Sequence, residues 1–413
     1  MINRRTFTTG ASAAALGTVA SPFVRRAGAA DASIKVGVIN SMSGSYAAYA
    51  QEGDPAFRYI IDKINKEGGV KSMGGAKIEL VFADDTSQPA RCATEVRRLV
   101  TEEKVDMLTG TMLSSQMLAI SPVLDELQTP CLSVWAGGSR SNWLYTLGYD
   151  YDRGYAKTMA DFAIWLRDKN GFSIKTWSPC YSNYEAGQQV NKHLLKRMGD
   201  AGFKTLEEAP LDTKAQDQTS AMIRLRSAKP DLALGLVTPR DGLLLHQARY
   251  NLNYHGSIFA GGTGGYSDLS LWRDLSPDIA KAVLTRNLFA MTGFSPSAKM
   301  PSMQAIVTEL RDQAKLQRIG QAAIQSAQAA RVLQRTIEAA GSRDKKALLD
   351  GFKKVDIKFG DPDLYVAKPH GVKFADDRLL EDGSAFFVQW MEDKTQQVLT
   401  PEQFANAKPR PRS

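Results

Sequence analysis

The stretch that decides the fold is residues 34–52, which read IKVGVINSMSGSYAAYAQE. An apolar run opens it, and a loop rich in glycine and hydroxyl side chains separates that run from a helical pattern at residues 53–67. Further apolar runs at residues 77–83, 105–109 and 130–135 alternate with amphipathic stretches of helix length. This strand–helix alternation predicts an α/β fold, with parallel sheets covered by helices on both faces.

The second half of the chain repeats the pattern. Strands are predicted at residues 173–177, 231–237 and 257–260, with helical stretches between them. Two such sheets in series predict two doubly wound lobes. A long helix at residues 320–340 and a strand at residues 385–391 follow, and late strands of this kind often return to an earlier lobe.

The N-terminal residues 1–30 have the composition of an export signal. Four arginines and no carboxylate flank a small, mildly apolar run: Arg4, Arg5, Arg25 and Arg26. A charged region, an apolar region and a small-residue site predict secretion, with cleavage near residue 30. The first arginine pair resembles the twin-arginine kind, although the export route stays open. The apolar run is too short to span about 30 Å of hydrocarbon, so we expect a periplasmic protein and not an anchored one.

Charge and composition exclude several classes of partner. The net charge is +8, and the arginines of the signal account for half of it. The remaining charge is unclustered apart from a basic tail at residues 403–413, so no nucleic-acid partner is expected. The histidines never occur at metal-ligand spacing, which predicts no metal site. Cys92 and Cys131 are interpreted as buried small hydrophobes, and pairing of any two of these and Cys180 stays open.

Ligands of open α/β sheets bind at the carboxyl ends of the strands. The loops that follow the predicted strands are rich in hydroxyl, glycine and aromatic residues and lack pairs suited to acid–base chemistry. A serine at a helix start, such as Ser114 or Ser115, can hold a carboxylate, with simple N-capping as the alternative. Tyr49, Trp135 and Tyr184 fit pocket walls or core packing equally well.

Enzyme signatures are absent from the sequence. It contains no nucleophile elbow and no phosphate-binding P-loop, and the glycine run at residues 262–265 lacks the third glycine of a dinucleotide fingerprint. We therefore expect a binding protein without a cofactor, and not an enzyme.

Three segments carry a family resemblance: residues 34–52, residues 75–89 (GAKIELVFADDTSQP) and residues 105–116 (VDMLTGTMLSSQ). They resemble the branched-chain amino-acid (leucine/isoleucine/valine) binding proteins of ABC importers, which are type I periplasmic solute-binding proteins. The similarity covers nearly the whole mature chain and is strongest over residues 34–139.

The resemblance implies two Rossmann-like lobes joined by a three-crossover hinge, with the ligand in the cleft between them. Lobe one would comprise residues 32–152 plus 288–372, and lobe two residues 153–287 plus 373–402.

The resemblance also implies site residues. Tyr49 would line the pocket, Ser114 with Ser115 beside it would hold a ligand carboxylate, and an aromatic wall of lobe two falls on Tyr184. Donors after the fourth strand fall on residues 135–139. The full set of predicted ligand-binding residues is Tyr49, Ser114, Ser115, Trp135, Ala136, Gly138, Ser139, Arg153, Tyr184, Thr263 and Tyr266.

Two departures from the family pattern bear on the ligand. The loop at residues 260–266 has no carboxylate to pair with a ligand ammonium until Asp268, and a buried ammonium without an anion is costly. A family disulfide is also absent, because its positions hold Ser87 and Leu113. We therefore favour a carboxylate without an α-amine, such as an aromatic or short aliphatic acid. Arg153 could add a bond to the anion, or be a solvated helix-start residue.

The expected function is that of the solute-binding component of an ABC importer. The lobes would close about a small carboxylate by hinge bending, and the membrane permease would recognise the closed form. A monomer is expected. An exported sensor that presents its ligand to a membrane receptor is the alternative.

Overall fold

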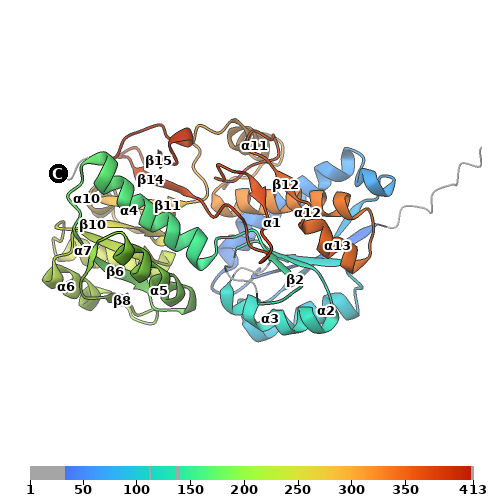
Figure 1. The fold of residues 1–413 in the computed structure, drawn as a ribbon, viewed down its shortest axis with the longest axis horizontal. Helices are drawn as coiled ribbons and strands as arrows, with labels where there is room; N and C mark the ends of the chain where they lie inside the picture. Colours follow the sequence, from blue (N-terminus) through green and yellow to red (C-terminus); the bar gives the residue numbers. More distant parts are fainter. Residues whose placement is uncertain (1–32, 111–112, 136, 138–139, 411–413) are drawn as a thin grey trace, which may run out of the picture.

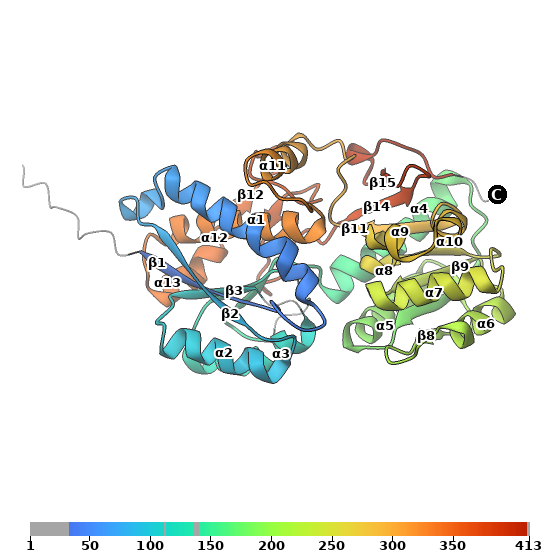
Figure 2. The same ribbon diagram turned by 180° about the vertical axis from the view of Figure 1, so that it is seen from behind.

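The computed structural model describes residues 33–110, 113–135, 137 and 140–410 and folds them into two α/β lobes (Figure 1). The predicted signal, residues 1–30, lies outside the described residues, as do the predicted site residues Ala136, Gly138 and Ser139. Figure 2 shows the same two lobes from behind, lying side by side. The predicted fold class is confirmed.

Lobe one is built on a five-stranded parallel sheet in the order β2-β1-β3-β4-β5. Its strands are β1 (Ile34–Asn40), β2 (Ile78–Asp84), β3 (Met107–Gly110), β4 (Cys131–Ser133) and β5 (Leu144–Thr146). Its helices are α1 (Ala47–Lys66), η1 (Lys71–Met73), α2 (Pro89–Thr101), α3 (Ser114–Leu127), α11 (Pro301–Asp312), α12 (Gln321–Ala340) and α13 (Lys345–Phe352). A short hairpin of β12 (Asp356–Ile357) and β13 (Val372–Lys373) completes it.

The side-chain alternation of β1 explains how lobe one is layered. Val36 and Val38 belong to a buried cluster with α1 and α12, whereas Ile39 points the other way into a cluster with α2 and α3. Successive strand residues face opposite sides of the sheet, so one apolar strand can bury both. Figure 1 shows α1, α12 and α13 on one face of this sheet and α2 and α3 on the other.

Lobe two has a larger sheet in the order β15-β14-β11-β10-β9-β6-β7, with β8 paired to β6. Its strands are β6 (Thr176–Ser182), β7 (Lys204–Thr205), β8 (Ala209–Leu211), β9 (Leu232–Leu236), β10 (Ile258–Gly262), β11 (Leu288–Thr292), β14 (Phe386–Trp390) and β15 (Gln396–Thr400). Its helices are η2 (Tyr151–Ala156), α4 (Lys157–Asn170), α5 (Glu185–Asp200), α6 (Thr219–Ala228), α7 (Pro239–Asn251), α8 (Gly264–Ser267), α9 (Ser270–Asp274), α10 (Pro277–Leu284) and η3 (Glu402–Phe404). Among the described strands of this sheet, β14 runs antiparallel to both of its neighbours, β11 and β15, at the edge where the chain returns.

Two predicted lobe boundaries are corrected by strand pairing. β11 pairs with β10 in the second sheet, so residues 288–292 belong to lobe two and not to lobe one. Leu379 bridges to Thr146 of β5, so the chain up to that point stays with lobe one beyond the predicted boundary at residue 373. Both corrections have one cause: pairing with a distant strand decides which lobe a segment joins.

The three crossovers between the lobes meet around Tyr149, which is buried. A Cβ atom on Gly293 of the second crossover would lie 2.4 Å from the Tyr149 hydroxyl oxygen. One on Gly383 of the third crossover would lie 2.6 Å from the Arg153 carbonyl oxygen. Real Cβ atoms do not approach other atoms so closely, so the crossovers pack tightly at two positions that have no side chain.

Lys368 is buried in the same place, with 1% of its surface exposed. Its Nζ donates to the Ser384 carbonyl oxygen at 2.7 Å and lies 4.3 Å from the centre of the Tyr149 ring. Burial lowers the pKa of Lys368 to about 8, while Asp382 and Asp150 attract its charge. Tyr149, Gly293, Lys368 and Gly383 are called the hinge cluster below.

The C-terminal segment does not behave as the predicted basic tail. Phe404 is fully buried against Phe386, with ring centres 5.2 Å apart. Gln389 of β14 donates to the Lys408 carbonyl oxygen at 3.0 Å and accepts from the Arg410 main-chain N–H at 3.1 Å. Residues 403–410 therefore line the edge of lobe two.

The cysteines are unpaired, and Cys92, Cys131 and Cys180 are all buried, as interpreted for the first two. In the part of the chain that the structure describes, no helix has the length and apolar character needed to cross a membrane.

Candidate functional site

Six aromatic residues gather where the two lobes face each other. Lobe one supplies Tyr46 and Tyr49 from the loop and helix after β1, and Trp135 from the loop after β4; the ring centres of Tyr49 and Trp135 are 5.7 Å apart. Tyr184 comes just before α5 of lobe two and interacts electrostatically with four of the other tyrosines. The group, called the interlobe site below, consists of Tyr46, Tyr49, Trp135, Tyr151, Tyr155 and Tyr184.

The tyrosines of the interlobe site are neutral hydrogen-bond donors. Burial raises the pKa of Tyr49, Tyr155 and Tyr184, and neighbouring tyrosines raise each of them further. The hydroxyls of these three residues have no hydrogen-bond partner among the described residues. They are therefore free to bind a polar group of a ligand, and an anionic group most strongly.

Ser114 is placed at the first turn of α3, where sequence reasoning expects it. Its side chain lies near the Tyr151 hydroxyl, where it opposes the rise that burial causes in the pKa of Tyr151. The same hydroxyl donates to Glu185 Oε2 of α5 at 2.9 Å. Ser115, the next residue, is exposed.

Buried hydrogen bonds hold the start of α3 in place. The Leu113 main-chain N–H donates to Gln116 Oε1 at 2.9 Å. Gln116 Nε2 in turn donates to Asp85 Oδ2 at 2.5 Å and to Ser41 Oγ at 3.0 Å. The loops after β1, β2 and β3 are therefore locked together, and the helix start is fixed relative to them.

A carboxylate of lobe two also faces this region. Asp268, just after α8, raises the pKa of Tyr49 and of Glu52 through space, in each case as a smaller effect than burial. Glu52 Oε1 accepts hydrogen bonds from the main-chain N–H groups of Gly320 and Ala323 at 2.9 and 3.1 Å, so this carboxylate already binds the start of α12. Asp268 accepts one hydrogen bond of its own lobe, from the Ser270 N–H.

The sequence of the chain matches a known protein family. A family model described as a periplasmic binding protein covers residues 33–395 of the chain. The chain belongs to this family.

Relatives of this periplasmic binding protein agree with the assignment. The Leu/Ile/Val-binding protein homolog 7 of Brucella suis is 25% identical over 391 residues, spanning 89% of this chain and 92% of the relative. The isoleucine-bound branched-chain amino acid transporter substrate-binding protein LivJ of Streptococcus pneumoniae superposes with a TM-score of 0.71 at 18% identity, covering 89% of this chain and 100% of that one. A solute-binding protein of an R. palustris ABC transporter, solved with 4-hydroxybenzoate, gives 0.72 at 20% identity, with 92% and 98% covered.

These relatives confirm the expected class. The chain is a periplasmic solute-binding protein and not an enzyme, and the similar solved structures are substrate-binding proteins of transporters. Among the residues that the structure describes, no group of histidine, cysteine, aspartate and glutamate is arranged to hold a metal ion.

The side chains of three predicted site residues of the binding protein are engaged within lobe two or at the hinge. Tyr266 is fully buried in lobe two, with its ring centre 5.9 Å from that of His246, so it is part of the core. The Thr263 hydroxyl donates to the Val237 carbonyl oxygen of its own lobe. Arg153 pairs with Asp377 at 2.6 Å, which places its guanidinium on the hinge side.

Sequence reasoning missed Tyr46, Tyr151, Tyr155 and Glu185, and it named Asp268 only as the first carboxylate after the lobe-two loop. Two of these, Tyr151 and Tyr155, belong to the first crossover between the lobes. The rule that ligands bind at the carboxyl ends of the strands, called the strand-end rule below, does not cover a crossover. The signal that could have found them is their spacing of four residues beside the predicted crossover, since such spacing places both on one face of a helical turn.

Proposed function

We propose that the protein binds a small carboxylate-bearing ligand at the interlobe site and delivers it to the permease of an ABC importer. The observation that carries the proposal is the convergence of neutral hydroxyls from both lobes beside a tryptophan ring: Ser114 and Tyr49 from lobe one, Tyr184 from lobe two, and Trp135 next to Tyr49. A ligand held by donors of both lobes stabilises the closed arrangement.

The carboxylate would bind at the start of α3. The Ser114 hydroxyl and the first main-chain N–H groups of a fourteen-residue helix are suited to an anion. Hydrogen bonds to a charged acceptor are about twice as strong as those between neutral groups. Ala136, Gly138 and Ser139 remain proposed as further donors.

The body of the ligand would pack against rings. Trp135, Tyr49 and Tyr184 offer aromatic walls, which suit an aromatic acid. The R. palustris neighbour bound to 4-hydroxybenzoate supports an aromatic carboxylate without an α-amine, and we favour this class.

An α-amino acid is the second candidate, and Asp268 is the observation that favours it. Asp268 lies just after the lobe-two loop in the sequence, and its carboxylate raises the pKa of Tyr49. The same carboxylate could pair with a ligand ammonium. The isoleucine-bound neighbour supports the same class.

Thermal shift measurements separate the two classes. The purified protein is heated alone and with 4-hydroxybenzoate, benzoate, leucine or isoleucine, because a ligand of the native state raises the melting temperature. Stabilisation by the benzoates supports the favoured class, whereas stabilisation by leucine or isoleucine alone rejects it. Asp268→Asn is the matched variant: it should abolish an amino-acid response and leave a benzoate response unchanged.

Export and assembly complete the proposal. We infer that residues 1–30 are removed on secretion and that the mature protein acts as a monomer. Mass spectrometry of the secreted protein gives its first residue, and light scattering gives its molar mass. A mature chain that retains Arg25 would contradict the cleavage site.

A further inference from the structure

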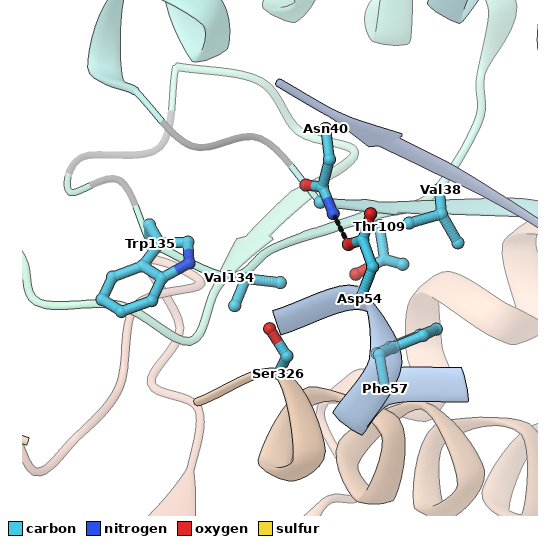
Figure 3. Close-up of a pocket in the computed structure, with 9 residues that line it drawn as sticks. Val38, Asn40, Asp54, Phe57, Thr109, Val134, Trp135 and Ser326 are labelled. Carbon is cyan, nitrogen blue, oxygen red and sulfur yellow. Dashed lines mark hydrogen bonds between the residues drawn. The ribbon is translucent and has the colours of Figure 1, made fainter. Parts of the chain in front are cut away.

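A small cavity lies in lobe one beside the interlobe site (Figure 3). It is lined by Val38, Asn40, Asp54, Phe57, Thr109, Gly110, Val134, Trp135 and Ser326. Its volume is about 10 Å³, the size that holds a single water molecule. The lining mixes apolar side chains with a carboxylate, an amide and an indole, which could satisfy such a water.

Asp54 is a buried carboxylate in the wall of this cavity. It lies on α1 with 8% of its surface exposed. Asn40 Nδ2, at the end of β1, donates to Asp54 Oδ1 at 2.5 Å. No hydrogen bond joins Oδ2 to any of the described residues. A buried carboxylate needs more than one donor to be stable in the charged form, so the cavity side of Asp54 calls for a second.

Trp135 offers the complementary group. Its indole Nε1 is buried and has no acceptor among the described residues. Figure 3 shows that nitrogen on the edge of the ring that faces Val134 and Asp54, across the cavity. The same ring packs against Tyr49 of the interlobe site, with the two ring centres 5.7 Å apart.

We propose that Asp54 is a positioning residue: one water in the cavity links its carboxylate to the indole N–H of Trp135, and the interlobe site thereby responds to pH. The ionised carboxylate accepts a hydrogen bond from the water, whose oxygen accepts from the indole. Protonation at Oδ2 turns this acceptor into an O–H donor, which reverses its hydrogen bond with the water and weakens the hold on the tryptophan ring. The inference rests on the proposed function, in which the Trp135 ring forms a wall of the ligand-binding site.

The charge environment of Asp54 is simple. Burial raises its pKa to about 6, and the Asn40 hydrogen bond and the Arg58 charge oppose that rise. Arg58 lies on the same helix and stacks 3.4 Å from the Phe82 ring of β2. The facing residues of β1, β3 and α12 that line the cavity, Asn40, Thr109 and Ser326, carry no charge. Asp54 is thus the group in this wall that titrates near neutral pH.

The test follows the indole N–H signals of the ligand-free protein by ¹⁵N NMR from about pH 4.5 to about pH 8, a range that brackets the transition. Trp135→Phe identifies the Trp135 signal, and Trp143, which does not line the cavity, is the internal control. We expect the Trp135 signal to shift with a midpoint near pH 6 and the Trp143 signal to stay in place.

Two variants sharpen the test. Asp54→Asn should abolish the transition. Asn40→Ala should move its midpoint to higher pH, because the lost hydrogen bond favours the ionised form. A Trp135 signal that does not move in the wild-type protein overturns the proposal, as does an unchanged transition in Asp54→Asn. No ligand is added, so a protein that fails to bind benzoates or amino acids still gives a clear answer.

Discussion

The interlobe site and the hinge cluster lie along the same boundary between the lobes, yet they differ in how closely the backbone packs, although the Tyr149 hydroxyl of the hinge also has no partner among the described residues. At the interlobe site, Tyr49, Tyr155 and Tyr184 have hydroxyls without partners among the described residues. At the hinge cluster, bare backbone packs around Tyr149, and the Lys368 ammonium donates to a carbonyl oxygen. Polar groups left for a ligand should affect binding when changed, whereas the packed hinge should affect stability.

Gly383→Ala should give the largest effect. A methyl group there would lie 2.6 Å from the Arg153 carbonyl oxygen, and backbone atoms cannot move aside cheaply. We expect a loss of about 3 kcal/mol in the free energy of unfolding, measured by urea denaturation. Gly199→Ala is the control, because that position on α5 has open space around its Cβ and should be neutral or slightly stabilised. Equal behaviour of the two variants would contradict a close-packed hinge.

Lys368 should give a smaller, pH-dependent effect. Its pKa is lowered to about 8 in the folded protein, below the ordinary lysine value of about 10.4 in the unfolded chain. Between these values the unfolded state binds more protons, so its contribution to stability should rise with pH, by on the order of 2 kcal/mol. The free energy of unfolding is compared at about pH 8 and about pH 10 in wild type and Lys368→Met. Lys368→Met should lack this increment. Lys373→Met, which removes an exposed ion pair with Glu381, should keep it, as the wild type does.

Ser114→Ala should weaken ligand binding by roughly 1–3 kcal/mol, because a carboxylate loses a donor. Titration calorimetry with the stabilising ligand gives the dissociation constant. The exposed neighbour Ser115→Ala is the matched comparison and should bind normally. If both serines cost the same affinity, or neither does, the assignment of the carboxylate to Ser114 fails.

Tyr184→Phe should give the smallest effect and the clearest contrast with the hinge. It removes one hydroxyl that has no partner among the described residues, so the melting temperature of the free protein should not change. Affinity should fall by about 1 kcal/mol if the ligand uses that donor. A drop in melting temperature without a change in affinity would place Tyr184 with the core instead of the site.

The sequence predicts β1 to β4 of lobe one well because each is an apolar run bounded by turn residues. The prediction of β6 is displaced toward the N-terminus. The strands that are missed are β5, β7, β8, β11, β12, β13 and β15. β5 is only three residues long, and no local pattern tells that β11 joins the second sheet by pairing with β10. Such long-range pairing is why the lobe boundaries at residues 288 and 373 had to be corrected.

The site is predicted only as far as the strand-end rule reaches. Tyr49, Trp135 and Tyr184 follow strands and do come together. Tyr266 also follows a strand, but its ring turns into the core, since the rule gives a position and not a side-chain direction. Tyr151 and Tyr155 enter from the crossover, whose path depends on how the two lobes pack.

The buried, unpaired cysteines have a practical consequence for measuring this protein. The thiolate is the reactive form of cysteine, and burial raises the pKa of Cys92, Cys131 and Cys180. None of the three is within reach of a maleimide dye in the folded state. A single cysteine introduced at the exposed Leu269, beside Asp268, would therefore be the one labelled thiol, and its fluorescence would report ligand binding without removal of any native residue.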